Sequence, residues 1–166
     1  MNRDEMVDLW EQHAAYEFII KDADKTVSTM VDDASVMHLP TMSGDFGKEA
    51  LRRYYREDFI PGIPADTTQE TVARSVGDTF LLEESIMRMT HDQVVPFLLP
   101  GLEPTGKVVE VDFLVMVQFR DGLMQSERLY WDQAAVLSQL GLIDSSLPFA
   151  PVSEVSKFLR DQVINA

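Results

Sequence analysis

The chain has 166 residues, of which 45% are hydrophobic and 25% charged, as in a single soluble globular domain. Twenty-eight acidic residues against fourteen basic ones give a formal net charge of −14. Such a surface repels phosphate backbones and anionic lipids, which argues against binding to nucleic acid or to a membrane. The absence of cysteine excludes disulfides and thiolate chemistry. Because there is no signal-peptide pattern and no apolar run that could span a bilayer, we expect a cytoplasmic protein.

The first third of the chain is expected to be mainly helical. Apolar residues recur at steps of three and four from residue 3 to residue 22, in a stripe that also contains His13 and Glu17, and this spacing predicts an amphipathic helix. Asp24 can cap a short second helix, and the Pro61-Gly62 pair ends a third. The expected elements are helices at about 3–22, 24–30 and 48–59, a strand at 34–40 and a turn at 44–47.

The rest of the chain is expected to be mainly strands. Alternating apolar residues predict strands at 71–76, 79–91, 108–120 and 123–132, followed by short helices at 133–140 and 153–164. Helices that precede strands are typical of an α+β domain. We expect one domain over residues 1–166, with a core at about 3–141 and a C-terminal extension at 142–166.

The Asp121-Gly122 pair is a strong signal for a two-residue hairpin turn. A regular hairpin about this turn would place Val115 opposite Arg128 and Phe113 opposite Tyr130, and opposed side chains share a face. The face expected to line a pocket would then carry Val111, Phe113, Val115, Val117, Met124, Arg128, Tyr130 and Asp132. The other face, with Glu127 and Trp131, would be free for solvent or for a dimer partner. A slip of one residue would reverse this assignment.

Asp132 is the first candidate for an acid/base group. At the mouth of an apolar pocket, burial would raise the pKa of its carboxyl toward the range useful for proton transfer. The alternative is that Asp132 only caps the helix that starts near Gln133. Tyr130 could donate a hydrogen bond to a developing oxyanion, or it could be an ordinary aromatic strand residue.

The three histidines are further candidates. His91 closes a strand and could act as a base, or it could bond to nearby backbone. His38 precedes Pro40 on a short strand, where a structural role is the alternative. His13 lies on the inner stripe of the first helix near Tyr16, where it could be a satisfied core residue or a ligand-binding group. No histidine spacing typical of a metal site and no nucleotide-binding motif occurs, so we expect no metal and no cofactor.

An ordered set of short motifs carries a family likeness. Thr90-His91, residues 101–107, residues 119–122, Glu127, Trp131-Asp132 and residues 139–141 together resemble the SnoaL-like, polyketide-cyclase-type branch of the NTF2-like superfamily. This resemblance implies a cone-shaped α+β fold, in which a curved antiparallel sheet wraps around N-terminal helices and encloses an apolar pocket. It also implies a homodimer.

The resemblance also bears on the reaction. In the cyclases an aspartate on the last strand is the acid/base for an aldol ring closure, a nearby histidine assists, and no cofactor takes part. Asp132 and His91 match those positions and become the predicted catalytic pair, with Tyr130, Arg128, His13, Tyr16, His38 and Phe113 as predicted substrate-binding residues. Arg128 departs from the usual tryptophan or histidine, and the longer apolar segment 96–101 could form a lid.

Three functions remain open from the sequence. The first is a cyclase or isomerase type of enzyme that abstracts and returns a proton on a hydrophobic carbonyl compound. The second is a non-catalytic domain for ligand binding or dimerisation. The third is a hydrolase or dehydratase on the same fold, because a shared fold does not transfer a reaction.

Overall fold

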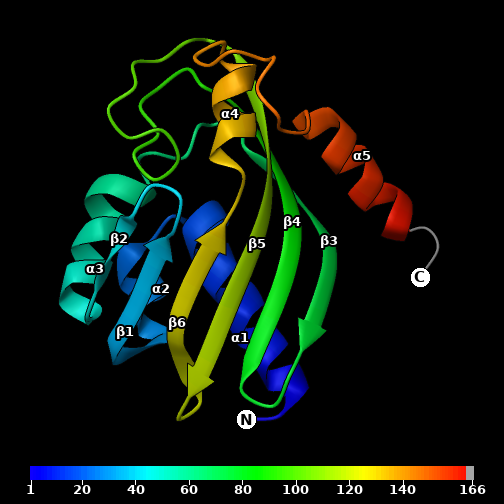
Figure 1. Ribbon diagram of the computed structural model, residues 1–166. Coiled ribbons are helices and arrows are strands. Elements are labelled where there is room, and N and C mark those ends of the chain that lie inside the picture. The colour runs from blue at the N-terminus through cyan, green and yellow to red at the C-terminus, as the bar shows by residue number, and fades with distance from the viewer. Residues whose placement is uncertain (164–166) are drawn as a thin grey trace.

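A computed structural model describes residues 1–163 of the chain. In it, one strongly bent sheet curls around the N-terminal helices (Figure 1). The helices are α1 (Arg3–Ala15), α2 (Ala23–Ser28), α3 (Lys48–Tyr54), α4 (Gln133–Gln139) and α5 (Val152–Val163). Both α1 and α3 continue directly into π-helical turns, η1 (Tyr16–Ile20) and η2 (Tyr55–Phe59). The α+β class expected from the sequence is confirmed.

The described residues form one six-stranded sheet in the order β2-β1-β6-β5-β4-β3. The strands are β1 (Met30–His38), β2 (Ser43–Phe46), β3 (Thr68–Val76), β4 (Phe80–Thr90), β5 (Val108–Arg120) and β6 (Leu123–Tyr130). All neighbouring pairs are antiparallel except β1 and β6, which run parallel. The sheet therefore departs in one pair from the purely antiparallel arrangement expected. The segment 44–47, expected as a turn, instead pairs with β1 as the short edge strand β2.

The first helix forms where the apolar stripe predicted it. Asn2 and Glu5 make a reciprocal capping box at its start, which satisfies backbone N–H groups that the helix leaves free. Met6, Trp10 and His13 then follow at steps of four and three, and all three are buried against the sheet. The π-helical turn carries Glu17 onto the same inner face. The helical stripe thus brings two ionisable residues into the core.

The hairpin between β5 and β6 has the predicted turn but a different register. Asp121 and Gly122 both have positive φ, as such a turn requires, and Arg120 opposes Leu123 as expected. A β-bulge then inserts Gln125 without a partner, so that Ser126 opposes Gln118. Because side chains alternate across a strand, this one extra residue exchanges the two faces for the rest of β6.

The bulge corrects the predicted face of the hairpin. Val111, Phe113, Val115, Val117 and Met124 are buried on the inner face, as predicted. Arg128 and Tyr130, predicted to line the pocket, lie on the outer face opposite Met116 and Leu114. Glu127, predicted to lie on the outer face, opposes Val117 and is buried. The physical reason is the inserted residue, which no feature of the local sequence marks.

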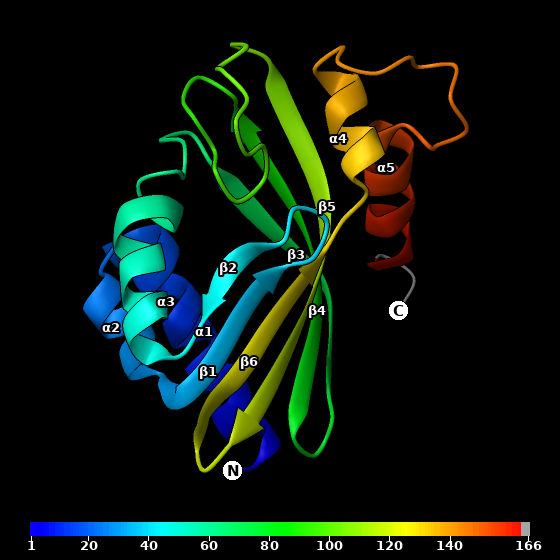
Figure 2. The same cartoon turned by 60° about the vertical axis from the view of Figure 1, so that its left-hand side comes forward.

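The C-terminal segment lies on the side of the sheet opposite α1, α2 and α3 (Figure 2). The amphipathic helix α5 packs on β5 and β3, and its buried Ser156 donates a hydrogen bond of 2.8 Å to Asp112. The predicted helix at 153–164 is thus present, apart from Ile164, which lies outside the described residues. The outer face of the sheet is covered toward β3 and open toward β6.

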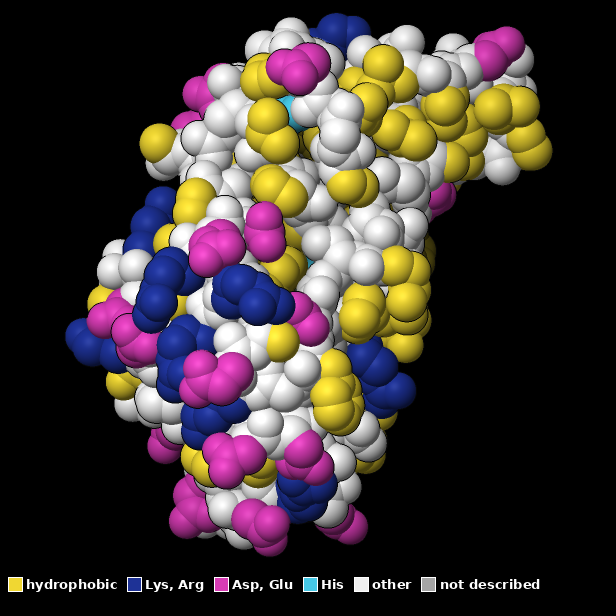
Figure 3. Space-filling model, turned by 90° about the vertical axis from the view of Figure 1, so that its left-hand side faces the viewer, with side chains coloured by type: hydrophobic (Ala, Val, Ile, Leu, Met, Phe, Trp, Pro, Cys, Tyr) yellow, Lys and Arg dark blue, Asp and Glu magenta, His cyan; other side chains and the backbone are white. Residues whose placement is uncertain are grey.

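The surface around α3 carries both signs of charge (Figure 3). Arg52 and Arg56 both pair with Asp24, so these arginines form ion pairs across helices and do not make a basic stripe. Within residues 1–163 no helix is both long and apolar enough to cross a membrane.

Candidate functional site

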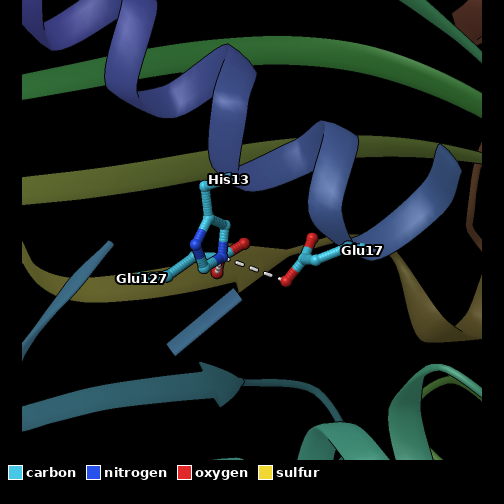
Figure 4. A group of neighbouring side chains, drawn as sticks. All are labelled: His13, Glu17 and Glu127. Atoms are coloured by element: carbon cyan, nitrogen blue, oxygen red, sulfur yellow. Dashed lines mark ion pairs between the residues drawn. The ribbon is translucent and has the colours of Figure 1, made fainter. Parts of the chain in front are cut away.

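Three buried ionisable side chains meet between the first helix and the sheet (Figure 4). His13 comes from α1, Glu17 from η1 and Glu127 from β6. The Nε2 atom of His13 lies 3.1 Å from Glu17 Oε1 and 3.6 Å from Glu127 Oε2, and each side chain is 5% exposed or less. Burial of a charged group is costly unless it is paired. In this cluster the histidine and the two glutamates pair with one another inside the core.

His13 is held as a protonated ring. Its Nδ1 lies 2.6 Å from the hydroxyl of Thr29, and that hydroxyl donates its own hydrogen to the carbonyl of Thr26. Nδ1 must therefore be the donor, while Nε2 faces Glu17 and, at 3.3 Å, the hydroxyl of Tyr55. Burial lowers the pKa of His13, but the two glutamates outweigh burial and raise this pKa to about 10.

Glu127 is the least satisfied member of the cluster. Its Oε2 atom is buried and has no hydrogen-bond partner among the described residues, because the 3.6 Å separation from His13 is that of an ion pair. Burial raises the pKa of the Glu127 carboxyl, the charge of Glu17 raises it further, and His13 opposes this shift. Burial and the charge of Glu17 thus shift this pKa in the direction that favours a protonated carboxyl, and His13 acts in the opposite direction.

His38 brings a second imidazole to the same region. Its Nδ1 lies 3.2 Å from the carbonyl oxygen of Ser43 and 3.2 Å from the hydroxyl of Tyr54. Because a carbonyl can only accept, Nδ1 carries the proton in this contact, and in the neutral ring Nε2 keeps a free lone pair. Burial lowers the pKa of His38 to about 4, against the opposing effect of Glu127, so the ring is neutral at physiological pH.

A small cavity joins these groups. Its volume is about 30 Å³, which is room for one or two water molecules. The apolar part of the wall includes Trp10, Phe18, Phe59, Phe97, Phe113 and Leu129. The polar part consists of Glu17, His38, Gln69, Ser85 and Glu127. An acid and a base therefore face one space that is otherwise mostly aromatic.

The donor atoms of His13, Glu17 and Glu127 lie within 4.8 Å of one another, a spacing that the search for histidine motifs did not anticipate. Their contacts are those of an ion pair. Nε2 of His13 lies 3.1 Å from Oε1 of Glu17, a distance at which the two atoms share a proton. The arrangement is therefore suited to proton chemistry.

The structure divides the predicted site residues into two groups. His38 and Phe113 line the cavity, and His13 lies directly behind its two glutamates. Tyr16 is partly buried in η1 but is not part of the cavity wall. Arg128 and Tyr130 lie on the outer face because of the bulge in β6.

The two predicted catalytic residues both lie outside the cavity wall. Asp132 caps α4, where its carboxylate accepts hydrogen bonds of 2.8 and 3.1 Å from the amides of Ala134 and Ala135. His91 is buried at the end of β4, with Nδ1 3.1 Å from the hydroxyl of Thr105. The alternative considered for Asp132, a helix cap, is thus the one that its contacts match.

Sequence reasoning missed Glu17 and Glu127. A signal for Glu17 was present, since an acidic residue four positions after His13 shares its face of the helix. An acid on the apolar stripe of an amphipathic helix needs a partner, and His13 is that partner. Glu127 could not be found in the same way, because the bulge in β6 moves its side chain from the predicted outer face to the inner face.

No protein-family model and no curated protein matches the chain. Solved structures do match. TsrD from Streptomyces laurentii superposes with a TM-score of 0.67 at 15% identity, over 86% of this chain and 99% of that one. A protein described as a SnoaL-like polyketide cyclase from Jannaschia gives 0.63 at 15% identity, over 82% and 94%. An LEH-like epoxide hydrolase from M. tuberculosis gives 0.61 at 13% identity, over 83% and 90%.

The chain has the NTF2-like fold. This confirms the curved sheet wrapped around helices that the family likeness implied. At these identities the similarity shows the fold and leaves the reaction open. In this chain η1, β1 and β6 supply the ionisable groups that face the cavity, Glu17, His38 and Glu127.

Proposed function

We propose that this protein catalyses proton transfer on a hydrophobic carbonyl compound held in the cavity, with Glu127 as the acid and His38 as the base. The observation that carries the proposal is the Oε2 atom of Glu127, which is buried at the cavity without a hydrogen-bond partner. A native protein rarely leaves such an atom unsatisfied without a functional reason. A substrate oxygen would supply the missing partner.

The placement of the two residues supports their pairing. In the parallel pair β1 and β6, Glu127 is opposite Val36, and His38 follows Val36 by two residues on the same face. Both side chains therefore face the same space from neighbouring strands. Rigid strands hold such groups more accurately than loops do.

Their protonation states are complementary. Burial raises the pKa of Glu127 and lowers that of His38, which are the directions that favour a proton on the acid and a free lone pair on the base. Environments that push the pKa values of two groups in opposite directions are the usual means of separating an acid from a base in one site.

The reaction follows from these roles. Nε2 of His38 takes a proton from the carbon next to the substrate carbonyl, while Oε2 of Glu127 gives its proton to the carbonyl oxygen, which yields an enol. Collapse of the enol returns a proton to Glu127. Protonation at a different carbon by His38 would give an isomer. Attack of the enol carbon on a second carbonyl would close a ring, with the proton held by His38 passing to the new alkoxide oxygen and the enol proton returning to Glu127. Solved structures with this fold include one described as a polyketide cyclase and one described as an epoxide hydrolase, and a positioned acid and base can serve either kind of reaction.

Exchange of the α-hydrogens of methyl decyl ketone in heavy water, followed by NMR, tests the proposal. We expect the wild-type protein to accelerate exchange, and Glu127→Gln and His38→Gln each to lower this acceleration by about 10²–10⁴-fold, the usual contribution of a positioned acid or base. Asp132→Asn is the matched control, because asparagine also caps helices and Asp132 lies outside the cavity wall. Unchanged exchange in both cavity variants, or none in the wild type, would refute the proposal.

A hydrolase or dehydratase is the second candidate. The observation that favours it is the cavity volume of about 30 Å³, since a water molecule fits between Glu127 and His38. In that case His38 would activate the water and Glu127 would protonate the oxygen of an epoxide. Incorporation of isotopically labelled water into the product of styrene oxide would distinguish this reaction from isomerisation.

A further inference from the structure

The cavity that contains the acid and base is too small for the substrate that its chemistry requires. At about 30 Å³ it accommodates a reacting group and not a whole molecule, because small-molecule sites usually measure several hundred cubic ångströms. Any larger part of the substrate must therefore lie elsewhere, in a space that connects with the cavity.

One neighbouring groove meets this condition. It runs between the first helix and the edge strand β3, has a volume of about 440 Å³, and is open to solvent along its length. Four residues, Trp10, Ala14, Phe18 and Gln69, line both the groove and the cavity. The two spaces thus adjoin at these four residues, and a molecule with its head at Glu127 would have to pass between their side chains to reach the groove.

The helical side of the groove is apolar and exposed. Ile19, in the π-helical turn, lines the groove and is 80% exposed, more than any other large hydrophobic side chain among the described residues. Phe18 and Ala15 extend this apolar strip. An exposed apolar strip beside a reactive cavity is typical of a ligand-binding surface.

Three charged residues that line the groove are paired with one another. Arg74 of β3 bonds to Glu11 of α1 at 2.8 Å and to Glu83 of β4 at 2.6 Å. Both acids thereby neutralise the arginine and leave no free cation in this ion-pair network for an anionic substrate. The groove therefore suits an uncharged chain.

We propose that the groove between α1–η1 and β3 is a second binding subsite, which holds the alkyl tail of the carbonyl compound whose reacting end lies in the cavity. The inference rests on the proposed function, because it assigns the substrate class for that same site. The substrate is then an elongated, uncharged amphiphile with a carbonyl group near one end and an aliphatic chain.

Calorimetric titration with methyl ketones that carry butyl, heptyl and decyl chains tests the subsite. We expect the affinity of the wild-type protein to rise about twofold to fourfold for each added methylene, as partial to full burial predicts. Ile19→Asp should lower the affinity for the decyl ketone by about tenfold and leave that for the butyl ketone unchanged. Ile20→Asp is the matched control, since Ile20 is the adjacent isoleucine, is also exposed, and does not line the groove.

A wild-type affinity that is independent of chain length, or an equal dependence in wild type and Ile19→Asp, would overturn the subsite. Equal losses of affinity for the decyl ketone in Ile19→Asp and Ile20→Asp would also rule out the proposed subsite. Glu127→Gln separates this proposal from the proposed function. It should abolish ketone exchange while preserving the dependence on chain length, so each proposal can fail without the other.

Discussion

Glu127 differs from the other buried acids in having an oxygen without a partner. Glu83 bonds directly to Arg74, and Glu17 lies 3.1 Å from the imidazolium of His13. Replacement of Glu127 by an apolar residue would remove the cost of burying this carboxyl. Its retention in the core suggests a role in binding or catalysis that outweighs this cost.

The depressed pKa of His38 predicts an effect on stability in acid. The folded-state pKa is about 4 and the ordinary value for histidine is 6.5, so between these values the unfolded chain binds the proton more readily. The contribution of His38 to stability is therefore present above pH 6.5 and is lost as the pH falls toward 4, by up to ~1.4 kcal/mol per pH unit. We expect His38→Gln to reduce the dependence of the unfolding free energy on pH between about 4 and 6.5, as measured by denaturant unfolding at a series of pH values.

His13→Gln provides the control with the opposite sign. Because the pKa of His13 is raised to about 10, its contribution is present below pH 6.5 and is lost as the pH rises toward 10. Replacement of His13 by glutamine should therefore reduce the dependence of the unfolding free energy on pH between about 6.5 and 10. Glu127 and Tyr54 are the titratable groups that face His38, and neither is altered in His38→Gln. Parallel profiles for wild type and His38→Gln between pH 4 and 6.5 would contradict the assignment.

At the residue scale, helical periodicity was a better guide to the site than strand alternation. His13 was identified because a histidine on an apolar stripe must face the core, and Glu17 occupies the same stripe. On β6, by contrast, alternation placed Arg128 and Tyr130 inside and Glu127 outside, which is wrong after the bulge. Asp132 was chosen by family position, but its actual surroundings are the amides at the start of α4.

At the scale of elements, the long helices and strands were predictable, and short or interrupted ones were not. Residues 3–20 and 48–59 are helical as expected, although the spacing gave no sign that their last turns are π-helical. The edge strand β2 was missed because it has four residues and contains Gly44, whose φ of 139° most side chains avoid. Its pairing depends on β1, which local sequence cannot reveal.

The bulge in β6 can be tested with cysteine pairs, since the chain has no cysteine of its own. Leu114 and Tyr130 are directly opposed on the outer face, within the range in which a disulfide can form. We expect Leu114→Cys with Tyr130→Cys to cross-link under mild oxidation, as measured by mass spectrometry. Phe113→Cys with Tyr130→Cys, opposed only in the unbulged register, should remain reduced. Cross-linking of the second pair in place of the first would show that β6 has no bulge.

At the scale of the whole molecule, the outer face of the sheet is only partly covered. The helix α5 packs over β5 and β3, and hydrophobic side chains remain exposed on the rest of this face. Leu114 and Tyr130 are among the exposed ones. Arg128 lies on the same strand as Tyr130, two residues earlier; its Nη2 donates to Met116 Sδ, but its Nε is buried without a hydrogen-bond partner in the described part of the chain.

These features favour a second copy of the chain as the partner of the outer face. Arg128 has no ion pair among residues 1–163, and a symmetric dimer would bring acceptors from the other copy to it. The apolar residues beside Arg128 would form the centre of such an interface, where aromatic and arginine side chains contribute most.

Light scattering coupled to gel filtration tests this dimer. We expect twice the chain mass of 18.8 kDa for the wild type and a monomer for Tyr130→Asp, because a buried unpaired carboxylate opposes association. Phe158→Asp is the control, since Phe158 is 60% exposed but belongs to α5, away from the open part of the sheet. A monomeric wild type, or dissociation by both variants, would exclude the outer face as the interface.

Retained ketone exchange in monomeric Tyr130→Asp would further show that each chain holds a complete site, as expected when every group facing the cavity comes from one copy.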